Sequence, residues 1–159
     1  MIFKRRIVRE KVLQILYAYE MNDKSMEMLR DDLFSEVKEK ADREFGDKLL
    51  REVIHHIPEL DEKIRGKVNN WELDRIALVD KTLLRMGICE LLYFEDIPPK
   101  VSINETIEIA KTYSTAGSGK FINGILDAEL SELKKTGKLH KVGRGLIEGN
   151  IAKNLKQDN

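Results

Sequence analysis

The most apolar stretch of the chain runs from Asp74 to Phe94 and contains no proline. It is too long for a strand, and its leucine, methionine and alanine content favours a helix. At about 100° per residue its apolar side chains point in almost every direction, which is typical of a helix surrounded by other helices. Asp74 and Asp80 are the candidate N-caps, and Pro98-Pro99 prevents the helix from continuing. The pattern therefore predicts one buried central helix.

One-sided apolar stripes predict further helices before and after this stretch. Pro58 suits the first turn of a helix, and the run from Ser102 to Glu105 has the form of a capping box. No stretch alternates with the period of two that is typical of strands, so the predicted fold class is all-α. The additional helices are expected at about residues 5–20, 25–40, 42–57, 58–71, 102–113 and 120–133.

The first of these helices carries an unusually basic first turn, which opposes the helix dipole. Arg5 is expected in an extended arm just before the helix. The buried stripe is predicted to comprise Val8, Val12, Ile15, Leu16 and Tyr19, and the adjacent flank Arg6, Arg9, Leu13 and Tyr17. This flank would present two guanidinium groups and an aromatic ring. The pattern alone fits either a solvated basic end or a ligand-binding surface.

Composition adds a charge asymmetry to this picture. The chain has 159 residues, 42% of them hydrophobic and 35% charged, with a formal net charge of zero. Residues 20–48 hold ten acids against six bases, whereas the segment from Lys134 onward holds seven bases against two acids. Because the charges are distributed unevenly, a neutral total charge does not exclude a local nucleic-acid surface.

We expect a helical domain over residues 1–135 and a basic, glycine-containing, mobile tail over residues 136–159.

The single cysteine, Cys89, lies in the predicted central helix and is expected to be a buried hydrophobic residue. It cannot form a disulfide within the chain, which suits a reducing cytoplasm. No stretch has the length and apolarity of a signal peptide or a membrane span. The predicted location is cytoplasmic, without membrane association.

Two motifs suggest chemistry that the rest of the sequence does not support. Residues 117–120 resemble the end of a phosphate-binding P-loop, but Ser114 and Phe121 replace the glycine and the hydroxyl residue that the motif requires. What remains is a glycine loop before a helix N-terminus, beside Lys120, which suits one backbone phosphate. His55 and His56 are adjacent and point about 100° apart, so they do not form a metal pair. No cofactor, metal site or catalytic pairing is predicted, and the protein is not expected to be an enzyme.

The basic N-terminal residues, Lys120 and the rings of Tyr17, Tyr113 and Phe121 are the side chains that a single-stranded nucleic acid requires. Cations bind the phosphates, and unpaired bases stack on aromatic rings. Phe121 lies off the apolar stripe of its helix, which favours an exposed ring. Tyr113 also continues the buried stripe of its helix, and for both Tyr17 and Tyr113 a place at the edge of the core is the more common case.

At these residues the chain resembles the NusB family of transcription antitermination factors, over roughly residues 4 to 133. The match is most specific in the run from Lys120 to Asp127, which follows the matching Gly119. The other matching residues are Arg5-Arg6, Arg9-Glu10, Leu16-Tyr17, Trp71, Leu73 to Ile76, Val79 to Lys81, Leu83 to Arg85, Glu90-Leu91, Ile97-Pro98, Ile103 to Glu108 and Ala110-Lys111.

The resemblance implies about seven helices in two small bundles around the central helix, and no catalysis. It implies binding to the boxA element of ribosomal RNA leader transcripts together with NusE, a small-subunit ribosomal protein, and entry into the elongating RNA polymerase complex with other Nus factors. It assigns Asp80, at the start of the central helix, to the surface that faces NusE. It assigns RNA binding to Arg5, Arg6, Arg9, Tyr17, Lys111, Tyr113, Lys120 and Phe121.

Two departures from the family pattern bear on this expectation. Gly117 stands where some relatives carry an acid that tempers RNA affinity, and the tail beyond about Lys138 exceeds that of many relatives. Two alternatives also remain. The same helical module is found fused to RNA cytosine methyltransferases, which would require a further α/β domain. The module could instead be a protein-binding scaffold whose basic ends only confer solubility.

Overall fold

The computed structural model describes residues 2–21, 26–69 and 72–147, and the expected helix cap Ser25 and the motif residue Trp71 lie outside these ranges. Within the described residues the protein is entirely helical and contains no strand, which confirms the all-α prediction. The α-helices are α1 (Ile2–Glu20), α2 (Met26–Ser35), α3 (Lys40–His55), α4 (Ile57–Arg65), α5 (Leu78–Tyr93), α6 (Pro99–Tyr113) and α7 (Ser118–Lys135), and the 3₁₀ helices are η1 (Leu73–Arg75) and η2 (Gly143–Leu146).

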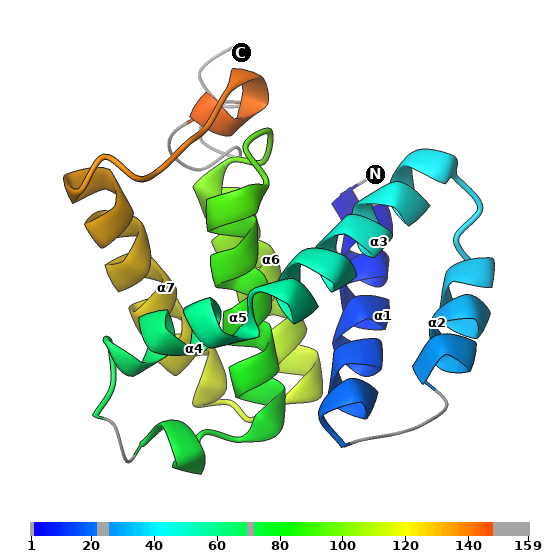
Figure 1. Cartoon of the computed structure of the whole chain (residues 1–159), viewed down its shortest axis with the longest axis horizontal. Helices are drawn as coiled ribbons and strands as arrows, with labels where there is room; N and C mark the ends of the chain where they lie inside the picture. The colour runs from blue at the N-terminus through cyan, green and yellow to red at the C-terminus, as the bar shows by residue number, and fades with distance from the viewer. Residues whose placement is uncertain (1, 22–25, 70–71, 148–159) are drawn as a thin grey trace.

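The helices form two bundles that meet at α5. Helices α1, α2 and α3 pack together on one side, and α4, α6 and α7 gather around α5 on the other (Figure 1). The predicted central stretch is divided, because η1 forms a separate turn and α5 begins after Ala77. Ala77 is the N-cap, so the expectation that Asp74 or Asp80 caps this helix is wrong.

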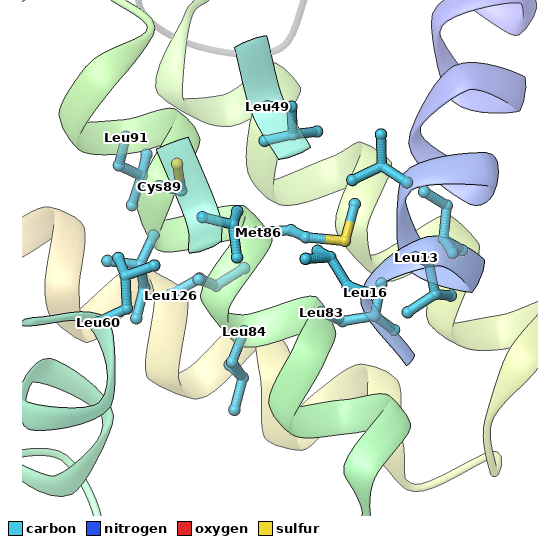
Figure 2. Packing of buried hydrophobic residues seen from close by; sticks show 14 of the residues in the cluster. Leu13, Leu16, Leu49, Leu60, Leu83, Leu84, Met86, Cys89, Leu91 and Leu126 are labelled. Carbon is cyan, nitrogen blue, oxygen red and sulfur yellow. The ribbon is translucent and has the colours of Figure 1, made fainter. Parts of the chain in front are cut away.

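The side chains of α5 are buried on nearly every side, as the sequence pattern predicts. Leu83, Leu84, Met86 and Leu91 are fully buried among residues of the other helices (Figure 2). Cys89 is also fully buried, and burial raises the pKa of its thiol. Close packing against α7 depends on a glycine in α5. A Cβ atom at Gly87 would lie 2.9 Å from the Leu126 side chain.

Helix α1 is covered from two sides, which changes the prediction for its flank. It packs against α2 and α3 on one side and against α5 and α6 on the other. Leu13 and Arg9, expected beside the buried stripe, are therefore buried, whereas Tyr19 at the end of the helix is exposed. Because α1 begins at Ile2, the expectation of an extended arm at Arg5 is also wrong.

The prolines mark the helix starts better than the capping box does. Pro58 lies in the first turn of α4, as predicted. Helix α6 begins at Pro99 with Pro98 as its N-cap, so Ser102 is an internal residue of the helix and the predicted capping box is wrong. Proline suits the first helical position because its missing N–H would have no partner there.

After α7 the chain returns to the end of α5. The Val142 N–H donates to the Glu95 carbonyl at 2.9 Å, and the Lys141 ammonium donates to the carbonyls of Glu90 and Phe94 at 3.1 and 2.6 Å. Lys141 thus adds a second donor to the carbonyls of Glu90 and Phe94, which also accept hydrogen bonds from the N–H groups of Phe94 and Ile97, and its charge lies at the C-terminal end of α5. Burial lowers the pKa of Lys141 to about 8. The division at residue 135 and the mobility of the tail stay predictions, since residues 148–159 are not described.

Candidate nucleic-acid interface

Helices α1 and α6 lie side by side and run in the same direction, since two side-chain pairs between them join residues 99 positions apart. Nε and Nη2 of Arg6 donate to the Glu105 carboxylate at 2.7 and 2.9 Å. Two turns further along, Nε2 of Gln14 donates to the Tyr113 hydroxyl at 3.4 Å. The Arg6 side chain remains 25% exposed, whereas Glu105 is almost covered. These pairs place Arg6 and Tyr113 along one seam of the surface.

Arg9, one turn below Arg6, is only 2% exposed, so the expectation that it lies on an open flank is wrong. Its Nε and Nη2 donate to the Glu90 carboxylate at 2.9 and 2.7 Å, and the Ser102 hydroxyl donates to the same carboxylate at 2.9 Å. Burial opposes the charge of Arg9, but the Glu90 carboxylate outweighs this effect and raises the pKa of the guanidinium. Arg9 therefore faces α5 as a charged, fully paired side chain.

Arg5 is partly exposed and lies against an aromatic ring. Its guanidinium carbon is 4.6 Å from the centre of the Phe45 ring, and that of Arg9 is 5.0 Å away. Phe45 in turn meets Phe94 edge to face, with ring centres 5.6 Å apart. Cation–π contacts of this kind orient a guanidinium without neutralising it. Arg5 thus stays available as a positive charge at the start of α1.

The last turns of α1 and α6 and the first turn of α7 carry exposed aromatic and basic residues. Tyr17 of α1 is 41% exposed, and Tyr113 and Phe121 are each 38% exposed. The exposed Phe121 ring confirms its predicted position off the apolar stripe, whereas the expected burial of Tyr113 is wrong. Lys111 is exposed and paired with Glu108 at 2.7 Å, and Lys120 is exposed without an ion pair to another described residue.

Asp80 lies beneath the turn between α6 and α7 and is 8% exposed. Its two carboxylate oxygens accept hydrogen bonds from the Ser114 hydroxyl at 2.6 Å and the Ser118 hydroxyl at 2.8 Å. The turn covers Asp80, so its carboxylate is not an isolated acid on an open side of the helix. Its assignment to a protein-binding surface stays a prediction.

The residues that sequence reasoning missed are the partners of the charged groups: Glu90, Glu105, Ser114 and Ser118. Glu90 carried a usable signal, because a carboxylate inside the most apolar stretch of a chain must find a buried partner. The sequence around Glu105 gave no signal of its ion pair with Arg6, since its capping-box position suggested a local role. Residues that pair across such distances in the chain have no fixed sequence spacing from which the pair could be predicted.

The described residues contain no group of three or more histidine, cysteine, aspartate or glutamate side chains that could hold a metal ion. His56 instead stacks on Tyr93, with ring centres 4.1 Å apart. No helix among the described residues is long and apolar enough to cross a membrane. The distinctive surface comprises the seam between α1 and α6 and the first turn of α7, which packs against α6, with their exposed rings and cations.

Comparison with known proteins gives one consistent result. The sequence model of the NusB family matches residues 6–130. The transcription antitermination protein NusB of Chloroherpeton thalassium is 47% identical over 153 residues, covering 93% of this chain and 71% of that protein. NusB of Salinibacter ruber is also 47% identical, over 145 residues that cover 90% of this chain and 91% of that protein.

Solved structures give the same family. T. maritima NusB superposes with a TM-score of 0.74 at 36% identity, covering 80% of this chain and 91% of that one. A chain from a crystal structure of the antitermination factors NusB and NusE in complex with dsRNA gives a TM-score of 0.73 at 26% identity, covering 83% of this chain and 99% of that one.

Proposed function

Because this chain belongs to the NusB family of transcription antitermination proteins, we propose that it binds boxA-type RNA of ribosomal RNA leader transcripts together with NusE. In this role it joins the elongating RNA polymerase with other Nus factors, in the cytoplasm. The family acts by binding and not by catalysis, so the protein is not an enzyme.

The observation that carries the RNA assignment is the seam between α1, α6 and α7. Tyr17, Tyr113 and Phe121 expose rings there, although only 6% of the residues are aromatic. Exposed rings beside cations provide base stacking and phosphate binding together. A NusB relative has been solved with NusE and dsRNA, which supports RNA as the partner. A duplex hides the faces of its bases, so we expect a single strand on the rings of this chain.

The residues have two kinds of role in this proposal. Arg5, Arg6, Lys111 and Lys120 bind phosphates, and the three exposed rings stack on bases. Arg9 is buried and fully paired, so it acts by holding α1 against α5 through Glu90. The buried pair thereby sets the position of the neighbouring Arg6, whose guanidinium reaches the surface.

We propose that NusE binds at the start of α5. Ala77 is exposed and Leu78 and Val79 are partly exposed, so this turn offers apolar contact area. Asp80 belongs to the same turn and places its negative charge just beneath the surface. This surface and the RNA seam meet at the turn between α6 and α7, which suits joint binding of RNA and NusE.

The test is a titration of the protein with short boxA-like RNA, with and without NusE, at several salt concentrations. We expect binding to the single strand that weakens with salt and strengthens when NusE is present. A scrambled strand of equal length and the same sequence as a duplex are the controls, and both should bind more weakly. NusE binding without any RNA affinity, alone or in the complex, would instead favour the protein-binding scaffold.

A further inference from the structure

The turn between α6 and α7 is closed by one carboxylate. Ser114 is the C-cap of α6 and Ser118 is the first residue of α7, and both donate their hydroxyl protons to Asp80 of α5. Ser118 is itself buried, and its N–H donates to the Thr115 carbonyl at 3.1 Å. Asp80 therefore fixes the end of one helix and the start of the next to the same point of the central helix.

The hydroxyl protons of this cluster can satisfy both oxygens of Asp80. Each hydroxyl has a single proton, and those of Ser114 and Ser118 are directed to the two oxygens of Asp80. The hydroxyl oxygens of Ser114 and Ser118 lie 2.9 Å apart, but in this arrangement neither hydroxyl donates a hydrogen bond to the other. The Thr115 hydroxyl, 3.0 Å from Ser118, becomes the donor to Ser118. In this arrangement both oxygens of the Asp80 carboxylate accept a hydroxyl proton, and every neighbouring hydroxyl acts as a donor.

Two residues of the proposed RNA seam follow directly after this anchor. Lys120 and Phe121 lie in the first turn of α7, and the Phe121 N–H donates to the Gly117 carbonyl at 3.3 Å. Gly117, the N-cap of α7, contributes no side-chain hydrogen bond. The Asp80–Ser118 bond thus ties the start of this helix to α5. A shift of Ser118 displaces the ring and the ammonium that follow it.

We propose that Asp80 is a positioning residue for RNA binding, which holds the α6–α7 turn so that Lys120 and Phe121 meet the strand together. The proposal rests on the proposed RNA function. It differs from a partner-contact role for Asp80, in which replacing the acid weakens NusE binding and leaves RNA binding by the isolated protein unchanged.

The test uses Asp80→Asn and Ser118→Ala in the full chain, with Asp47→Asn as the matched control. Asparagine keeps the size of the side chain but replaces an acceptor by a donor, which faces hydroxyls that already donate. Asp47 is an exposed acid on α3, so its replacement removes the same charge far from the turn. Ser118→Ala removes one anchor bond while leaving Asp80 bonded to Ser114, and it keeps the test open if Asp80→Asn does not fold.

We expect both anchor variants to bind single-stranded RNA about 5-fold or more weakly, in the range of one misplaced stacking contact. In a Lys120→Ala/Phe121→Ala background the Asp80→Asn change should have almost no further effect, because the groups it positions are absent. Amide hydrogen exchange at residues 115–121 should be faster in both variants, with or without RNA. The Asp47→Asn protein should match the parent in every measurement.

Three results would overturn the proposal: unchanged RNA affinity in the folded variants, an equal loss in the background that lacks both side chains, or unchanged exchange in the turn. A loss of NusE affinity with RNA affinity preserved would assign Asp80 to the partner surface instead. If the parent protein binds no RNA, the proposed function fails, while the exchange data still decide whether Asp80 holds the turn.

Discussion

Arg9 of α1 and Glu90 of α5 form a two-point ion pair in the interior of the protein, between residues 81 positions apart. Glu90 is fully buried and also accepts a hydrogen bond from Ser102 of α6. The pair therefore ties the first helix of one bundle to the central helix of the other. A buried charge pair stabilises a fold only while both partners are present.

Replacing Arg9 by alanine should lower the free energy of unfolding by about 3–5 kcal/mol, because Glu90 is left as an unpaired buried charge. The double variant Arg9→Met/Glu90→Leu should recover much of this loss, since it removes both charges and refills the space. Lys4→Ala is the control, since Lys4 pairs with Glu39 on the surface, and it should change stability little. Urea unfolding measures all three, and near-parental stability of Arg9→Ala would contradict the role of the pair.

Lys141 should make the free energy of unfolding depend on pH between about pH 8 and pH 10.5. Its pKa is lowered by burial to about 8 in the folded protein, against 10.5 for an exposed lysine. Between these values the unfolded chain holds one more proton than the folded protein, so the free energy of unfolding rises with pH. Below about pH 8 both states are protonated and this contribution is flat.

The parent protein should therefore gain up to about 3 kcal/mol relative to Lys141→Met between pH 8 and 10.5. Lys138→Met, which removes an exposed lysine of the same segment, should follow the parent curve. Denaturant unfolding at a series of pH values measures the three proteins. Parallel curves for the parent and Lys141→Met would show that the ammonium is not buried at the end of α5.

The helices and the core could be predicted from the sequence because both depend on local spacing. The stretch 74–94 is apolar all round, and α5 within it is buried on nearly every side. The stripe Val8, Val12, Ile15 and Leu16 of α1 is buried, as its spacing indicates. Tyr19 continues the same spacing but is 38% exposed in the last turn of α1, which periodicity alone does not reveal.

The polar partners could not be predicted, because each is set by packing between distant segments. Ser102 and Glu105 have a capping-box spacing, yet Ser102 bonds to Glu90 and Glu105 pairs with Arg6. Arg9 reads as part of an exposed flank until α5 is placed against it. Asp80 likewise reads as an isolated acid, because the serines that cover it follow 34 and 38 residues later. Long-range burial overrides the local signal in each case.

Arg6→Ala should weaken RNA binding to many sequences alike and reduce the salt slope by about 0.7, the value for one lost phosphate contact on a single strand. Lys120→Ala should have the same signature. Lys40→Ala is the control, since Lys40 is an exposed cation on α3 that is not among the residues assigned to RNA binding. Titrations at several salt concentrations give the slopes. A slope unchanged in Arg6→Ala would mean that Arg6 serves only its pair with Glu105.

Phe121 offers the sharpest separation between RNA binding and stability, because the next residue in the chain provides an internal control. Phe121 is 38% exposed, whereas Ile122 is fully buried. Phe121→Ala should cost about 1–3 kcal/mol of RNA affinity through lost stacking and leave the salt slope unchanged. Ile122→Ala should instead cost about 2–5 kcal/mol of stability, and its folded fraction should bind RNA normally.

Phe121→Tyr completes the test of stacking, because it keeps an aromatic ring of nearly the same size. Since every base presents a face to such a ring, this variant should retain most of the RNA affinity that Phe121→Ala loses. Melting temperatures and RNA titrations on the three variants distinguish the roles. If Phe121→Ala melts far below the parent while its folded fraction binds RNA with parental affinity, the ring belongs to the core and the strand must stack on Tyr17 and Tyr113 alone.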